Sequence, residues 1–235
     1  MTSIGQFAFN SCEKIETVDF SGTTVLRSIN DGAFLSCSSI KNVEIPACVE
    51  SLGARVFGQC KSLETINIDP SNPNYTTVDG VLYDKKMETL IQYPGGHKGT
   101  SFTVPSTVKT IEVNALSMLT VLESLTIPDS VTTIKDGACT CPSYNIQLLS
   151  ISFGNGLTTT GPNPFICHHF LDKNGNELEQ TPENLRGHTF AGEDPDHMYI
   201  KESKSGDGFP IWAIAVIAIA ILAAIIGLVL WKRSR

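Results

Sequence analysis

The chain has 235 residues, which is enough for one large domain or two small ones. This length excludes a mini-protein that needs disulfides or a bound metal to fold. Charged residues make up only 17% of it and 19 residues are glycine, a composition that disfavours a coiled coil or a charged disordered chain. All 24 acidic residues and 14 of the 17 basic ones lie in residues 1–208, which therefore carry 14 − 24 = −10. This acidic balance argues against nucleic acid as a partner.

Residues 1–165 contain a motif that recurs about every 23 to 25 residues. The first copy is Ile4-Gly-Gln-Phe-Ala-Phe9, and matching segments begin at Ile29, Leu52, Ile111 and Ile134, with a sixth copy ending at Phe165. Four of the copies are followed by an L-x-x-L-x-L pattern, over residues 15–20, 40–45, 63–68 and 122–127. This period and this strand pattern are typical of a leucine-rich repeat.

Each repeat is expected to form one coil, because a single coil cannot bury its apolar edge whereas stacked coils share a continuous core. The sequence therefore predicts a β-rich leucine-rich-repeat solenoid with a curved parallel sheet, followed by a small β cap and a single C-terminal transmembrane helix. Alternation along each strand turns the residues between the apolar positions outward. These outward residues form the predicted binding face: Glu16, Asp19, Lys41, Glu44, Glu64, Asn67, Glu123 and Thr126.

The predicted binding face is polar, mildly acidic and without aromatic residues. Protein-binding surfaces are usually richer in Tyr, Trp and Arg, so the composition of this face does not identify a partner. The alternative is a solvated face that binds no ligand.

Between the third and fourth copies, residues 69–101 form a longer repeat that is expected to carry a small hairpin. Strand-like segments lie on both sides of an Asp-Gly pair at 79–80, which is a typical hairpin turn. Three tyrosines, Tyr75, Tyr83 and Tyr93, are either exposed on this insert or pack it onto the solenoid. Asn74 begins an Asn-Tyr-Thr sequon and is a candidate for glycosylation.

The frame I-x-x-I-x-x-x-A-F-x-x-C-x-x-L-x-x-I-x-I-P, together with the insert N-P-N-Y-T-T-V-D-G-V-L-Y-D-K-K, resembles the BspA-type (Treponema-type) leucine-rich repeats of surface proteins. The resemblance covers roughly residues 4–165. It implies extracellular display and binding to other proteins, in adhesion to host tissue, to matrix or to other microbes.

The cysteines suggest packing rather than chemistry. Cys12, Cys37 and Cys60 occupy one repeat position, where a small buried apolar residue would stack from coil to coil, and an oxidised pair of neighbours is the alternative. No catalytic motif is present, neither G-x-S-x-G, H-E-x-x-H nor a phosphate-binding glycine loop. We therefore predict a protein without enzymatic activity and without a cofactor.

Residues 166–208 lose the repeat period and are expected to form a C-terminal cap and a juxtamembrane linker. Five residues near this cap are weak candidates for a zinc site, although their spacing matches no known zinc finger and disulfides or free thiols are the alternatives: Cys139, Cys141, Cys167, His168 and His169. A segment from Asp172 spaces its acidic and amide residues like a calcium loop but has Glu177 where that loop requires glycine, which favours a hairpin turn.

The C-terminal segment 209–231 is predicted to be a transmembrane helix. Its core from Ile211 to Trp231 has no charge and, at about 1.5 Å per residue, spans roughly the hydrocarbon thickness of a bilayer. Trp212 and Trp231 stand near its two ends, and Lys232 and Arg233 follow. The positive-inside rule makes the tail 232–235 cytoplasmic and the repeats extracellular.

The N-terminus has neither the basic nor the apolar region of a secretory signal, and no capping segment precedes the first copy. We expect an N-terminally incomplete copy of a longer exported protein; the alternative is a tail-anchored cytosolic adaptor. The sequence thus predicts a single-pass protein of the cell membrane that is non-catalytic and mediates protein–protein interaction or adhesion. Its expected partners are an extracellular protein or a cell-surface or matrix ligand, and the lipid bilayer, but not nucleic acid. A passive envelope or spacer protein is the other alternative.

Overall fold

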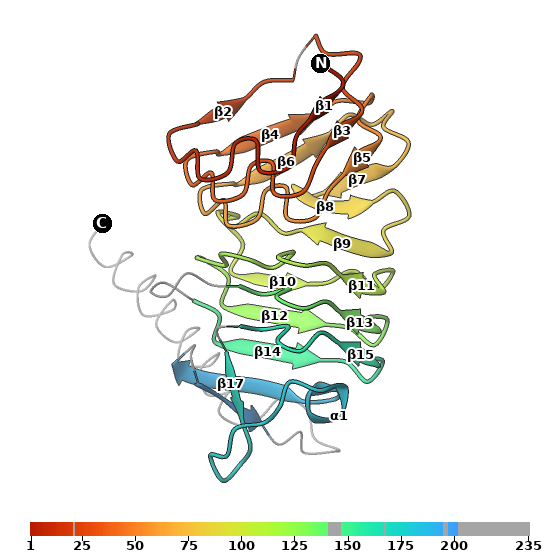
Figure 1. The fold of residues 1–235 in the computed structure, drawn as a ribbon. Helices are drawn as coiled ribbons and strands as arrows, with labels where there is room; N and C mark the ends of the chain where they lie inside the picture. Colours follow the sequence, from red (N-terminus) through yellow and green to blue (C-terminus); the bar gives the residue numbers. More distant parts are fainter. Residues whose placement is uncertain (21, 141–146, 167, 195–196, 202–235) are drawn as a thin grey trace, which may run out of the picture. The chain divides into compact units, whose positions relative to one another are not determined.

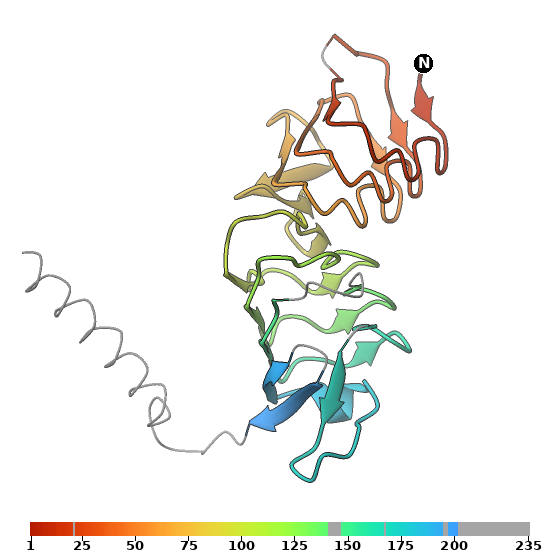
Figure 2. The same ribbon diagram turned by 90° about the vertical axis from the view of Figure 1, so that its left-hand side faces the viewer.

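The structure is a computed structural model that describes residues 1–20, 22–140, 147–166, 168–194 and 197–201. These residues belong to one compact unit, Met1–Lys201. Successive coils stack along it, and their short strands form four sheets, two from the first three coils and two from the later part of the chain (Figures 1 and 2). The chain is therefore a β-solenoid of stacked parallel strands.

The first three coils build two three-stranded parallel sheets. One sheet contains β1 (Ser3–Ile4), β3 (Ser28–Ile29) and β5 (Ser51–Leu52), and the other contains β2 (Thr17–Val18), β4 (Asn42–Ile45) and β6 (Thr65–Ile68). The register pairs residues one repeat apart, such as Val43 with Ile66. Equivalent apolar residues are thereby stacked, which is why the repeat period and not any single segment specifies the fold.

The later coils continue the same two-sheet plan. One six-stranded sheet has the order β15 (Thr159–Thr160), β13 (Thr133–Ile134), β11 (Thr110–Ile111), β9 (Thr89–Gln92), β8 (Val81–Asp84) and β7 (Tyr75–Val78). The other has the order β10 (Ser101–Thr103), β12 (Ser124–Ile127), β14 (Ser150–Phe153), β17 (Thr189–Asp194), β18 (His197–Lys201) and β16 (His169–Leu171). The sequence predicted one curved sheet. The structure has a second ladder of parallel strands, formed by the short segments at the start of each repeat motif, such as β3, β11 and β13.

Aromatic rings and thiols stack between the coils. Phe34 lies between Phe9 and Phe57, with ring centroids 5.1 and 5.6 Å away and planes within 8° and 13° of parallel. The Cys37 thiol donates a hydrogen bond to the Phe9 carbonyl oxygen at 3.0 Å, and the Cys60 thiol repeats this contact one coil later. Both thiols are buried and Cys12 is half-buried, as expected for a packing ladder.

The insert is an antiparallel hairpin in which Val78 pairs with Val81. Asp79 and Gly80 between them both have positive φ, 51° and 77°, the backbone that a tight Asp-Gly turn requires. Tyr83 and Tyr93 are only 1% exposed, so they pack the insert onto the solenoid. The Tyr75 hydroxyl accepts a hydrogen bond from the Leu52 N–H at 2.8 Å.

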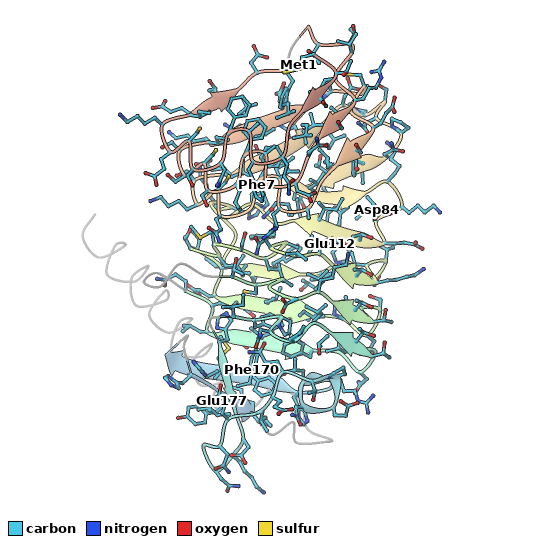
Figure 3. The ribbon with its side chains drawn as sticks, viewed as in Figure 1. Met1, Phe7, Asp84, Glu112, Phe170 and Glu177 are labelled. Atoms are coloured by element: carbon cyan, nitrogen blue, oxygen red, sulfur yellow. The ribbon has the colours of Figure 1, made fainter. Side chains whose placement is uncertain are left out.

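The cap covers the edge of the six-stranded sheet that contains β12 and β14. β17 runs antiparallel to β14, the last repeat strand of its sheet, with Phe190 beside Ile151. Phe190 packs with Phe153, Phe170 and other buried residues in the cap, where Figure 3 labels Phe170. The single helical turn α1 (Pro182–Leu185) precedes β17 and buries Leu185.

Residues 1–201, apart from the gaps given above, contain no helix long and apolar enough to cross a membrane. The predicted span 209–231, with Ile211, Trp212 and Trp231, lies outside the described residues, as do Lys232 and Arg233.

Candidate functional site

The predicted binding face is exposed, but its residues do not all lie on strands. Four of its residues each directly precede a strand, because β2, β4, β6 and β12 begin two residues after the start of the L-x-x-L-x-L pattern: Glu16, Lys41, Glu64 and Glu123. Asp19 follows β2, and the remaining members lie within strands: Glu44, Asn67 and Thr126. Six of the eight are exposed, and Glu64 and Thr126 are half-buried. Glu44 and Asn67 are neighbours across β4 and β6.

Three carboxylates of this face form no ion pair with another described residue, whereas Glu64 does. Glu64 pairs with Lys98 at 2.9 Å, and the hydrogen bond from that ammonium lowers the pKa of the Glu64 carboxyl. Among the described residues, no ion pair involves Glu16, Glu44 or Glu123. An exposed face with uncompensated negative charge attracts cationic surfaces over roughly a Debye length.

The charges beside the other sheets neutralise one another between coils. Arg27 and Glu50, which precede β3 and β5, are 3.2 Å apart. Lys109 contacts Glu88 at 2.6 Å and its hydrogen bond lowers the pKa of the Glu88 carboxyl. Lys135 and Glu112 form a further ion pair, with 2.6 Å between Nζ and Oε1. The two sides of the solenoid therefore differ electrostatically: these charges are compensated by ion pairs, whereas Glu16, Glu44 and Glu123 on the predicted binding face form none of the ion pairs of the described residues.

Burial protects two thiols of the repeats, Cys37 and Cys60, from reaction. Cys12, Cys37, Cys48, Cys60 and Cys139 are free. Burial raises the pKa of the Cys37 thiol, and it raises the pKa of Cys60 to about 12. Thiolates are the reactive form, so these buried groups are inert at neutral pH.

The described residues do not assemble a zinc site. Cys139 Sγ lies 3.8 Å from His168 Nε2, and both residues are buried. His169 turns instead to Glu177, with 2.6 Å between Nδ1 and Oε1. Cys141 and Cys167 lie outside the described residues. Within the residues that are described, no three His, Cys, Asp or Glu side chains converge on one point.

The segment that resembles a calcium loop is a hairpin turn. Asp172 Oδ1 accepts hydrogen bonds from the N–H groups of Asn174 and Asn176 at 2.7 and 2.9 Å. These donors lower the pKa of the Asp172 carboxyl, the side-chain amide of Asn176 contributing most. The carboxylate is thus used inside its own turn.

Asn74, the sequon residue, is exposed at the start of the hairpin. Its side-chain amide donates a hydrogen bond to the Glu50 carbonyl oxygen at 2.7 Å. Its exposure suits a modification site, and whether a sugar is attached stays a prediction.

One feature of the surface has no counterpart in the sequence predictions. A groove of about 930 Å³ lies between the last coil, residues 158–163, and the segment 177–183, which includes the start of α1. The only sequence signal for it was the end of the repeat period after Phe165, because a strand of the last coil has no following coil to cover it.

Comparisons with known proteins agree with this architecture. The model of the BspA type leucine rich repeat region matches residues 1–91 and 95–202, in six copies. A crystal structure of a leucine rich cell surface protein from Faecalibacterium prausnitzii is similar, with 29% identity and a TM-score of 0.62, over 73% of this chain and 45% of that one. A leucine-rich repeat protein from Eubacterium ventriosum has 28% identity and a TM-score of 0.50, over 68% and 53%.

The pneumococcal vaccine antigen PcpA shares the fold, with 22% identity and a TM-score of 0.62, over 73% of this chain and 48% of that one. The chain thus spans about half the length of each of these solved structures. Among curated proteins, none matches the chain.

Proposed function

Because the chain belongs to the BspA type leucine rich repeat family, we propose that it is a cell-surface protein that binds other proteins and has no catalytic role. In this proposal residues 209–231 anchor it in the membrane, the repeats face outward and the tail 232–235 is cytoplasmic. The similar protein from Faecalibacterium prausnitzii is a cell surface protein, which supports outward display.

The observation that carries the proposal is the electrostatic difference between the two sides of the solenoid. Ion pairs such as Arg27–Glu50 compensate the charges beside the β1-β3-β5 sheet. Glu16, Glu44 and Glu123 have no such partner among the described residues, although each is exposed. A surface of this kind favours a partner with a basic patch, bound through many weak contacts that salt would screen.

The test is adhesion of cells that display the full chain, expressed with its native upstream sequence, to immobilised extracellular matrix. The triple variant Glu16→Lys, Glu44→Lys, Glu123→Lys reverses the uncompensated charges. We expect it to lose most of the adhesion that added salt also removes. The matched control exchanges the ion pair Arg27→Glu with Glu50→Lys, which keeps the net charge and the pairing and should adhere like the parent protein.

Equal adhesion of the triple variant and the parent would reject this surface as the binding site. Absence of any saturable adhesion would favour a passive spacer protein instead. Protease treatment of intact cells checks the orientation. Release of peptides from residues 1–200 supports outward display, whereas their protection, with lysed cells digested in parallel, would favour a cytosolic adaptor.

A further inference from the structure

The last coil leaves the edge of one sheet open. In each earlier coil of the six-stranded sheet, one carbonyl oxygen accepts an N–H from the next coil. Leu90 accepts from Glu112 at 3.0 Å, Ile111 from Lys135 at 3.0 Å, and Ile134 from Gly161 at 2.8 Å. The next residue in this series, Thr160, belongs to β15, the end strand of the sheet.

The backbone of Thr160 therefore points away from β13. Thr159 and Gly161 on either side of it donate their N–H groups back to β13 and its flank, to the carbonyl oxygens of Thr132 and Ile134. In a parallel ladder alternate residues bond to opposite neighbours, so the N–H and the C=O of Thr160 both face outward. No described residue outside β13 pairs with β15.

The cap does not supply the missing strand. β17 pairs with β14 and so closes the sheet that contains β12, whereas β15 in the other sheet stays at the edge (Figure 1). Between β15 and the segment 177–183 lies the groove of about 930 Å³, with Thr160 in its lining. This volume is at the upper end of the usual range for ligand sites.

The groove is negatively charged and lined by hydroxyl groups. Glu177, Glu179 and Glu183 line it, and its lining contains no Lys, Arg or His. Glu177, labelled in Figure 3, contacts the His169 ring at 2.6 Å, while Glu179 and Glu183 are exposed and form none of the ion pairs of the described residues. Four threonines also line it: Thr158, Thr159, Thr160 and Thr181. A ligand that fits must offer a free backbone edge and positive charge.

We propose that this groove binds an extended segment of another protein that carries lysine or arginine and adds a strand to β15. The segment's N–H donates to the Thr160 carbonyl oxygen and its carbonyl accepts the Thr160 N–H, while its basic side chains reach Glu179 and Glu183. Strand addition to an exposed sheet edge is a common way for proteins to recognise peptides. The site is separate from the predicted binding face and does not depend on it.

The test measures fluorescence anisotropy of a labelled peptide, Thr-Lys-Val-Lys-Thr-Lys-Val, with the full chain in detergent. A peptide with Glu in place of Lys and a peptide with alternate backbone amides methylated are the ligand controls. Thr160→Pro removes the outward N–H but leaves the bonds of Thr159 and Gly161 to β13 in place. We expect it to weaken binding about 2- to 10-fold, the share of one hydrogen bond.

Ser3→Pro is the matched control, because β1 is the end strand at the opposite end of the solenoid and Ser3 there lies between Thr2 and Ile4, whose carbonyls bond to the second coil. It should bind the peptide like the parent. The double variant Glu179→Gln, Glu183→Gln, which does not touch the backbone, should also weaken binding and reduce its salt dependence. Glu44→Gln reports whether the peptide binds at the predicted binding face instead of in the groove.

Three results would overturn the proposal. The lysine peptide does not bind, it binds no better than the glutamate or the methylated peptide, or its binding is unchanged by both Thr160→Pro and the double glutamine variant. Loss of peptide binding in Glu44→Gln alone would move the site to the predicted binding face and likewise reject the groove. Because the cell-adhesion test uses other residues, either proposal can fail without the other.

Discussion

Replacing Phe34 with alanine tests whether the stacked rings hold the first coils together. Phe34 is 2% exposed and lies between two parallel rings, and it also meets the edge of Phe20 at 6.3 Å. Backbone hydrogen bonds fix the spacing between the coils. The Phe9 N–H donates to the Ala33 carbonyl oxygen at 2.8 Å, and the Phe34 N–H donates to the Val56 carbonyl oxygen at 2.9 Å. The void left by the ring therefore has little means of closing.

The loss of unfolding free energy in Phe34→Ala depends on how little the neighbouring coils can collapse into the void. Truncation of a buried Phe to Ala costs about 3 to 5 kcal/mol, and sites that cannot relax lie in the upper part of that range. We therefore expect about 4 kcal/mol for Phe34→Ala. Phe9→Ala removes the ring at the end of the stack, which is 38% exposed, and should cost about 1 to 2 kcal/mol. Phe34→Leu, which keeps more of the volume, should cost about 1.5 kcal/mol or more, but less than the alanine variant.

The assay is urea unfolding of the full chain in detergent, followed by circular dichroism, with native-state hydrogen exchange of the same variants. Solenoids gain stability from neighbouring coils, so the loss should be concentrated in the amides of β1, β3 and β5 and be small in β11 and β13. If Phe34→Ala costs no more than Phe9→Ala, or if the exchange rates rise equally in all strands, the stacked rings do not stabilise the first coils as we argue.

Three further predictions concern backbone strain, alkaline stability and the reactivity of a buried thiol. Arg55 has a φ of 57° at the repeat position where Gly32 and Gly137 have 59° and 58°. Because glycine adopts this left-handed backbone without strain, Arg55→Gly should raise the unfolding free energy by about 0.5 kcal/mol, measured by urea titration. A decrease would show that the contacts of the Arg55 side chain outweigh the backbone strain. Burial raises the pKa of Cys60 from 9.0 to about 12, which means that folding favours the protonated thiol. The stability that this thiol contributes is complete below pH 9 and is lost as the pH rises towards 12. Over this pH range the unfolding free energy of the parent should therefore fall more steeply than that of Cys60→Ala. Equal slopes of unfolding free energy against pH would contradict a raised pKa for Cys60. In the folded protein at about pH 8, Cys60 should also resist iodoacetamide that modifies it rapidly after unfolding, as mass spectrometry can measure.

Some local features of the chain can be predicted from the sequence because they depend on neighbouring residues alone. The Asp79-Gly80 pair adopts the left-handed backbone of a hairpin turn, and a turn needs only its own residues to form. The same holds for the Asp172 turn, where the carboxylate binds amides two and four residues ahead. Such elements can be placed before any tertiary contact is known.

Other contacts join residues one coil apart and carry no local signal. Asp31, Asp129 and Asp136 look like ordinary surface carboxylates, yet each accepts an N–H from the following coil. The donors are Ala54, Asn155 and Asn163, at 2.9, 2.7 and 2.9 Å. The strand boundaries show the same limit: Lys41 and Glu123 lie before their strands because hydrogen bonding between coils, and not the apolar pattern, decides where a strand begins.

The repeat period by itself determined the solenoid, since residues one period apart must stack for each apolar edge to be buried. Of the eight residues that it places on the predicted binding face, six are exposed and two, Glu64 and Thr126, are half-buried. Only the tertiary structure decided which of those charges are compensated, because Lys98 reaches Glu64 across a long separation in sequence. It also decided that the cap would close one sheet and leave Thr160 at the edge of the other, since no pattern within a repeat specifies how the chain continues after the last coil.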